Sequence, residues 1–125
     1  MQSGQHESSE NYLETILMLS RQGKAVRSID IVNELDYTRP SVSVAMKKLR
    51  TGGLIQVDPD GYITLTEEGR QIAESMYERH QVISNWLISI GVDEKTALDD
   101  ACRIEHVISE QSFLAIKNRT IDGGY

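Results

Sequence analysis

The sequence predicts a mostly helical protein with a small β-hairpin wing, in which a winged helix-turn-helix is followed by a helical dimerisation domain. Three observations predict this class. Two short amphipathic helical patterns are joined by the polar turn Asp36-Tyr37-Thr38, a hairpin pattern follows them at once, and a long helical pattern begins directly after the hairpin. We expect residues 1–70 to form the winged helix-turn-helix and residues 71–125 to form the second domain.

The first domain is expected to contain three helices. The first covers Glu10–Ser20, where apolar residues recur at helical spacing, and Ser8 or Ser9 can cap it. The second begins at Ser28, which offers an N-cap. The third carries Pro40 in its first turn, where the missing N–H costs nothing, and a glycine pair stops it.

A hairpin and three more helices complete the expected order. The hairpin strands are predicted at Leu54–Val57 and Tyr62–Leu65, on either side of a Pro-Asp-Gly turn. Thr66 is expected to cap a helix of about 24 residues, with an apolar stripe that ends at Ile90. Further helices are expected from Glu94 to His106 and from Ser109 to Lys117, and the tail from Asn118 to Tyr125 is expected to fray.

Composition is that of a globular protein without membrane association. Hydrophobic residues make up 39% and charged residues 26% of the 125-residue chain. No apolar run approaches the roughly 20 residues of a membrane-spanning helix, and the polar N-terminus lacks the apolar stretch of a secretory signal. The single Cys102 cannot form an internal disulfide, as in a reducing compartment. We therefore expect a cytoplasmic protein.

Charge is unevenly distributed along the chain. The net charge is −6, yet the window from Arg21 to Arg50 holds seven basic and three acidic residues, so that it carries +4 and the remainder −10. A basic segment in an acidic chain is the electrostatic footprint expected for phosphate, although a merely solvated helix face would have the same composition.

The third helix is the one expected to enter the major groove of double-stranded DNA. Its N-terminal residues would approach base edges, where only Arg39 offers a bidentate grip on guanine, and its later cations would contact phosphates. The candidate DNA-contacting residues are Arg27, Ser28, Thr38, Arg39, Pro40, Ser41, Ser43, Lys47, Lys48 and Arg50.

A second cluster indicates metal chemistry. Cys102, Glu105 and His106 stand at i, i+3 and i+4, which places a thiol, a carboxylate and an imidazole on one helix face. That donor set suits a divalent transition metal better than calcium or magnesium. Taken alone, the pattern also fits a small buried cysteine beside a surface Glu-His pair, and His80 alone fits a core histidine.

Several blocks resemble one family, in order and in spacing. They are residues 9–14 (SENYLE), 39–43 (RPSVS), 53–55 (GLI), 65–70 (LTEEGR), 79–80 (RH) and 101–106 (ACRIEH). The chain resembles the diphtheria-toxin repressor family of iron- and manganese-dependent transcriptional repressors across nearly its whole length. The resemblance implies a homodimer that binds operator DNA when loaded with metal, without enzymatic activity, in a short form that lacks the C-terminal small β-barrel of longer members.

The resemblance also implies a metal site, by position, at Asn11, Glu14, His80, Cys102, Glu105 and His106. Glu14 is similar to the manganese branch of the family and Cys102 to the iron branch, whereas Asn11 matches neither. Because sulfur is a soft ligand, Cys102 favours Fe²⁺, with Mn²⁺ as the alternative. The metal is expected to fix the DNA-binding domain against the dimerisation helices. It would thereby set the distance between the third helices of the two subunits, the reading helices, which enter the major groove.

Two other functions fit parts of the sequence. A winged-helix regulator could use Cys102 as a redox switch, but the neighbouring Asp99 and Asp100 disfavour a reactive thiolate. A small metal-dependent hydrolase would need a nucleophile–base pair and an apolar substrate pocket, and the sequence offers neither convincingly.

Overall fold

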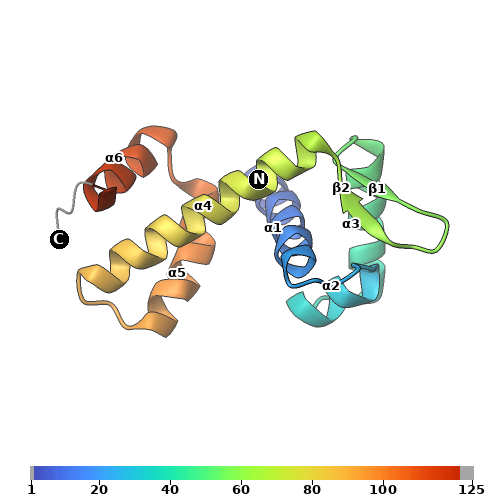
Figure 1. The fold of residues 1–125 in the computed structure, drawn as a ribbon, viewed down its shortest axis with the longest axis horizontal. Coiled ribbons are helices and arrows are strands. Elements are labelled where there is room, and N and C mark those ends of the chain that lie inside the picture. Colours follow the sequence, from blue (N-terminus) through green and yellow to red (C-terminus); the bar gives the residue numbers. More distant parts are fainter. Residues whose placement is uncertain (1, 122–125) are drawn as a thin grey trace. The chain divides into compact units, whose positions relative to one another are not determined.

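The computed structural model describes the backbone of residues 2–121 and the side chains of residues 9–119. Within that part of the chain the elements are α1 (Gln2–Arg21), α2 (Ser28–Leu35), α3 (Arg39–Thr51), β1 (Ile55–Val57), β2 (Ile63–Leu65), α4 (Glu67–Ser89), α5 (Glu94–Val107) and α6 (Glu110–Ile121) (Figure 1). The order confirms the predicted class, a mostly helical chain with a two-stranded wing.

The chain divides into two compact units. One is Gly4–Glu74 and the other begins at Ser75, so the division falls within α4. We call them the winged-helix unit and the helical unit. The predicted domain boundary after residue 70 stays a prediction. No helix among the described residues is both long and apolar enough to cross a membrane.

The core of the winged-helix unit is formed by one face of each helix and by the wing. Leu13 and Ile16 of α1, Ile31 of α2 and Val42 of α3 are fully buried. The Oγ1 of Thr38 caps α3, because it accepts a hydrogen bond from the backbone N–H of Ser41 at 3.3 Å. These contacts hold α2 and α3 as the helix-turn-helix pair that the sequence predicted.

Two predicted helix starts are wrong. Ser8 and Ser9 do not cap α1, because the helix begins at Gln2 and continues through them; serine inside a helix costs less than about 0.7 kcal/mol relative to alanine. Ser28 is the first residue of α2, and Arg27 takes the N-cap position. There the carboxylate of Asp30 reaches back and accepts a hydrogen bond from the Arg27 N–H at 2.8 Å.

The wing is a short antiparallel hairpin. Ile55 pairs with Leu65, and the strands are shorter than predicted, so that Leu54 and Tyr62 lie just outside them. Oδ1 of Asp58 accepts hydrogen bonds from the N–H groups of Asp60 and Tyr62, each at 2.9 Å, which closes the turn. The wing is tied to the helices because the N–H of Ile63 donates to the Val26 carbonyl at 2.7 Å.

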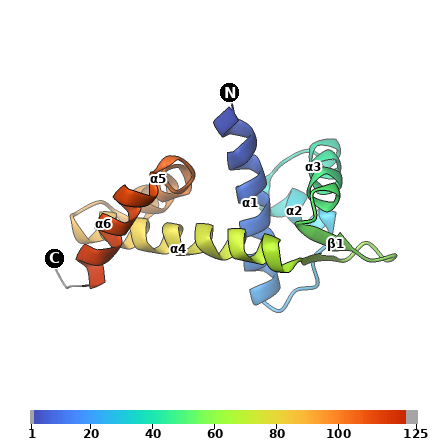
Figure 2. The ribbon, with the colours of Figure 1, turned by 90° about the horizontal axis from the view of Figure 1, so that it is seen from above.

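In the helical unit, α5 and α6 both lie beside the later turns of α4 (Figure 2). Ile83, Ala97, Ala101 and Phe113 form its buried centre. Asp93 caps α5, since its Oδ2 accepts a hydrogen bond from the Thr96 N–H at 3.1 Å. This bond lowers the pKa of the Asp93 carboxyl below its ordinary value.

Two predictions for the second half of the chain are wrong. Ile90 does not belong to the buried stripe of α4: the helix ends at Ser89, and the side chain is 54% exposed. The segment Asn118–Ile121 does not fray but continues α6. The rest of the predicted frayed tail lies outside the described residues.

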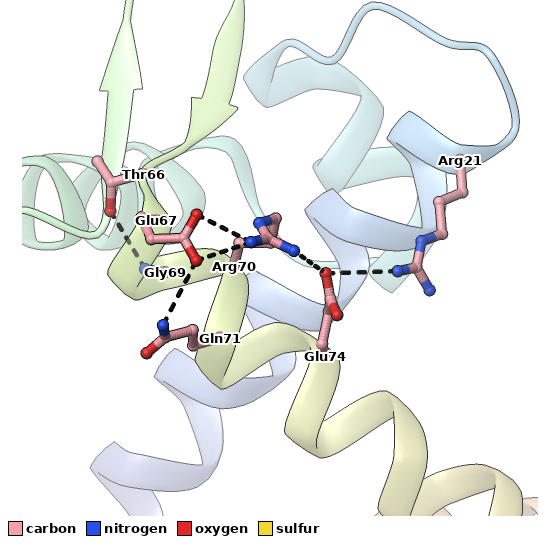
Figure 3. Close-up of polar contacts among 7 residues, drawn as sticks. All are labelled: Arg21, Thr66, Glu67, Gly69, Arg70, Gln71 and Glu74. Carbon is pink, nitrogen blue, oxygen red and sulfur yellow. Dashed lines mark hydrogen bonds and ion pairs between the residues drawn. The ribbon is translucent and has the colours of Figure 1, made fainter.

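The start of α4 is joined to α1 by a polar network in which Glu74 pairs with Arg21 at 3.6 Å (Figure 3). Oγ1 of Thr66 accepts the Gly69 N–H at 3.1 Å, as the sequence predicted for a cap. The guanidinium of Arg70 donates hydrogen bonds to the carboxylates of Glu67 and Glu74; the bond to Glu67, with that to Glu74, raises the pKa of Arg70, and the bond from Arg70 lowers the pKa of Glu67. Gly69 lies in the same turn of α4, where an added Cβ would overlap the Leu54 carbonyl oxygen.

Gly69→Ala is therefore expected to destabilise the winged-helix unit, because the methyl group would push α4 away from the start of the wing. Overpacking of this kind costs about 1–3 kcal/mol of unfolding free energy, to be measured by urea denaturation. Gly52→Ala is the matched control: its Cβ would lie 3.3 Å from the nearest atom, the Lys48 carbonyl oxygen. Equal losses in the two variants would contradict the prediction.

Candidate functional site

Three donor atoms converge in the helical unit. Nδ1 of His80, on α4, lies 2.9 Å from Oε1 of Glu105 and 3.8 Å from Sγ of Cys102, both on α5. One ligand atom from each of these three residues falls within 4.8 Å of the others. We call this set the donor cluster. Glu105 is 1% exposed and Cys102 is exposed, so the cluster runs from the core to the surface.

The donor cluster fits a divalent transition metal. Bonds of about 2.0–2.3 Å from nitrogen, oxygen and sulfur to one ion place neighbouring ligand atoms roughly 3–4 Å apart. The observed separations of 2.9 and 3.8 Å are of that size. Imidazole, carboxylate and thiol together suit iron, zinc or their neighbours better than calcium or magnesium.

His106 joins the same cluster through Glu105. Its Nε2 lies 3.5 Å from the other carboxylate oxygen, Oε2, and its side chain is 6% exposed. A histidine therefore stands beside each oxygen of the buried carboxylate. The structure thus brings together four predicted ligands, His80, Cys102, Glu105 and His106.

The other two predicted ligands lie on α1, in the winged-helix unit. Nδ2 of Asn11 donates a hydrogen bond to the hydroxyl of Tyr37 at 3.4 Å, and Glu14 is a buried carboxylate. The membership of Asn11 and Glu14 in the ligand set stays a prediction.

Arg79 supports the cluster, and sequence reasoning missed it. Its Nη1 donates to the main-chain carbonyls of Glu105 at 3.1 Å and Ile108 at 2.9 Å, and its Nη2 pairs with Glu110 at 3.1 Å. The guanidinium also lies 5.3 Å from the centre of the Phe113 ring. Arg79 thereby fixes the last turn of α5. Its position next to His80 was the only signal in the sequence. That position does not reveal that the partners of Arg79 are main-chain carbonyls more than 25 residues further along the chain.

The predicted DNA-contacting residues of α3 lie on its exposed face. Arg39, Pro40, Ser41, Lys48 and Arg50 are exposed. A pocket of about 240 Å³ opens beside this face and is lined by Ser28, Ser43, Met46, Lys47, Arg50 and Val57. Two cations and two hydroxyl groups around one pocket form a surface that suits an anion such as a phosphate.

Two predicted residues are engaged within the fold. The guanidinium of Arg27 lies 4.3 Å from the centre of the ring of Tyr62, the last residue of the wing's turn. Thr38 donates its hydroxyl hydrogen to Oγ of Ser41 at 2.8 Å. Contact of Arg27, Thr38 and the other candidates with DNA stays a prediction.

Comparison with known protein families gives two matches that follow each other along the chain. Residues 6–63 match the iron dependent repressor N-terminal DNA binding domain. Residues 66–120 match the iron dependent repressor metal binding and dimerisation domain. The first match contains α3 and its basic face, and the second contains the donor cluster.

Individual relatives agree with these matches. The chain is 35% identical over 108 residues to the transcriptional regulator MntR of Escherichia coli O6:H1. The matched segment covers 86% of this chain and 70% of that relative. It is 33% identical over 106 residues to the diphtheria toxin repressor of Corynebacterium glutamicum, covering 84% and 46% of the two chains. Among solved structures, the manganese regulator SloR superposes with a TM-score of 0.79 at 25% identity, covering 88% and 52%. The chain thus spans about half the length of the last two proteins.

Glu105→Gln is expected to weaken binding of Mn²⁺ by about 100-fold or more, because loss of a direct ligand should exceed the 10–100-fold effect typical of outer-shell changes. Isothermal titration calorimetry on the folded protein measures the affinity. Glu78→Gln is the control, since Glu78 also lies in the helical unit but pairs with Lys117. Comparable weakening in both variants would argue against the donor cluster as the site.

Proposed function

The chain belongs to the iron-dependent repressor family, and from this membership we propose that it represses transcription by binding operator DNA as a homodimer when loaded with a divalent transition metal. The family is one of transcriptional repressors and not of enzymes, so a hydrolase is excluded. The observation that carries the proposal is the convergence of His80, Cys102 and Glu105 in a chain that also has a basic reading helix. We propose that it acts in the cytoplasm, where such operators lie.

The DNA-binding role is supported by the chemistry of α3. The helix carries four basic residues, Arg39, Lys47, Lys48 and Arg50, and no acidic residue. A helix that follows a tight turn and precedes a wing is the element that enters the major groove in winged-helix proteins. The pocket lined by Ser28, Ser43, Lys47 and Arg50 would accept a backbone phosphate at the edge of that groove.

The dimer is supported by the surface of the helical unit. Several large apolar side chains of this unit are exposed, namely Ile88, Ile90, Leu98, Val107 and Leu114. Exposed apolar surface is typical of regions where a second subunit packs. A two-fold dimer would present two copies of α3 to successive major grooves, about 34 Å apart.

The metal we propose is ferrous iron. Cys102 supplies a soft sulfur donor 3.8 Å from His80, and sulfur favours iron over manganese. Manganese is the second candidate, because Glu14 adds a buried hard oxygen donor to the predicted set and because a manganese regulator is among the similar structures. Bound metal supplies a divalent charge that compensates the buried carboxylates.

Metal dependence follows if the ligands bind metal more tightly in the form that binds DNA. Differential affinity is the only way in which a ligand can shift such an equilibrium, and couplings of about 1–3 kcal/mol are typical. Arg79 holds the main chain of Glu105, so the ligand-bearing turn of α5 is fixed from its carbonyl side. Anaerobic fluorescence anisotropy with operator duplexes and Fe²⁺, Mn²⁺ or Zn²⁺ tests the proposal. An affinity for DNA that is the same with and without each metal would refute it.

Lys47→Gln or Arg50→Gln is expected to weaken DNA binding on all sequences and to reduce its salt dependence. Each phosphate contact adds about 0.9 to the slope of log K against log salt, so loss of one contact per subunit should lower the slope of a dimer by about 1.8. Titrations at several salt concentrations give the slope. Lys24→Gln serves as the control, because Lys24 lies outside α3 and pairs with Asp30 at 3.4 Å; a slope that drops equally in this variant would contradict the assignment.

Cys102→Ser is expected to narrow the preference of the protein for Fe²⁺ over Mn²⁺, because a hard oxygen replaces the soft sulfur. The ratio of the two metal concentrations that half-activate DNA binding measures the preference under anaerobic conditions. His106→Ala should instead weaken the binding of both Fe²⁺ and Mn²⁺. An unchanged ratio in Cys102→Ser would show that sulfur does not select the metal.

A further inference from the structure

One apolar side chain in the middle of the reading helix is mostly exposed. Val44 lies in the middle of α3 and is 56% exposed, whereas Val42, Met46 and Leu49 of the same helix are buried. Val44 stands four residues after Pro40, so these two exposed apolar side chains lie on one face of the helix. The residues predicted from the sequence to contact DNA include the hydroxyl and basic side chains around Val44 but not Val44 itself.

Local stability does not explain a valine at this position. A β-branched residue in an exposed helix interior loses side-chain freedom and is a poorer helix former than lysine, glutamine or arginine. Burial does not explain it either, because more than half of the side chain faces solvent. An exposed valine at this position is available for a contact outside the subunit.

The surroundings of Val44 identify the kind of contact. Ser41 and Ser43 flank it, and Lys47 and Lys48 follow one turn later; all four are exposed. No acidic residue lies on α3, although the chain as a whole carries a net charge of −6. An apolar patch bordered by hydroxyl groups and cations suits the floor of a DNA major groove, where phosphates lie on both sides of the base edges.

In the major groove, the apolar feature of a base pair is the C5-methyl group of thymine. We infer that Val44 contacts a thymine methyl in each half-site and thereby sets part of the sequence preference of this protein. The inference rests on the proposed DNA-binding function and adds to it a preferred base. Small side chains at Ser41 and Ser43 leave room for the helix to approach that closely.

The experiment begins with selection of bound duplexes from a randomised library by the wild-type protein with Mn²⁺. In the selected duplex, each thymine is then replaced in turn by deoxyuridine, which removes only the C5-methyl group. One position per half-site is expected to bind about fourfold more weakly after replacement, the effect of roughly one buried methyl group. In Val44→Ala, the thymine and deoxyuridine duplexes are expected to bind equally.

Arg50→Gln is the matched variant. It should bind more weakly overall but keep the fourfold thymine preference, because a phosphate contact carries no base information. Since Val44 is exposed, Val44→Ala should fold normally, and circular dichroism checks this. Sequence-specific binding that is indifferent to every thymine methyl, or a preference that survives in Val44→Ala, overturns the inference alone. Failure of the wild-type protein to bind any duplex overturns the proposed function as well.

Discussion

The helical unit depends on how the buried carboxylate of Glu105 is compensated. A charged group removed from water costs several kcal/mol unless hydrogen bonds or opposite charges replace its hydration. Here His80 faces one oxygen at 2.9 Å and His106 faces the other at 3.5 Å. A carboxylate between two imidazoles is well satisfied when a cation or a proton is present. The same arrangement that stabilises the core is therefore one that favours uptake of positive charge.

The rest of the unit fixes α5 so that Glu105 keeps this position. Ala97 and Ala101 are fully buried and precede Glu105 by two turns and one turn, so small side chains lie along the inward face of α5. At the end of the helix, Arg79 binds the Glu105 carbonyl from α4 and pairs with Glu110 on α6. Ligands carried by packed helices are held more rigidly than ligands on loops.

Sequence periodicity predicted most of the fold and two of the three members of the donor cluster, Cys102 and Glu105. Cys102, Glu105 and His106 share a helix face by spacing alone, so their proximity follows from local geometry. That His80 joins them depends on the packing of α4 against α5, which only the family resemblance indicated. Exposure was harder to predict: Ile90 was expected on the buried side because it continued the apolar period of α4, yet the helix ends at Ser89 and Ile90 is exposed.

The uneven distribution of charge along the chain keeps DNA binding weak enough for a metal to change it. Seven basic residues lie between Arg21 and Arg50, while the remainder of the chain carries −10. A uniformly basic protein would bind DNA through phosphate contacts whether or not metal were present. Coupling to a ligand typically changes affinity by about 5–150-fold, which matters only if binding without the ligand is weak. The acidic remainder, of which residues 75–125 carry −3, lowers the attraction of the whole chain for DNA, and a divalent cation held by the carboxylates of the site would offset part of that negative charge. Metal dependence then arises from electrostatics as well as from geometry.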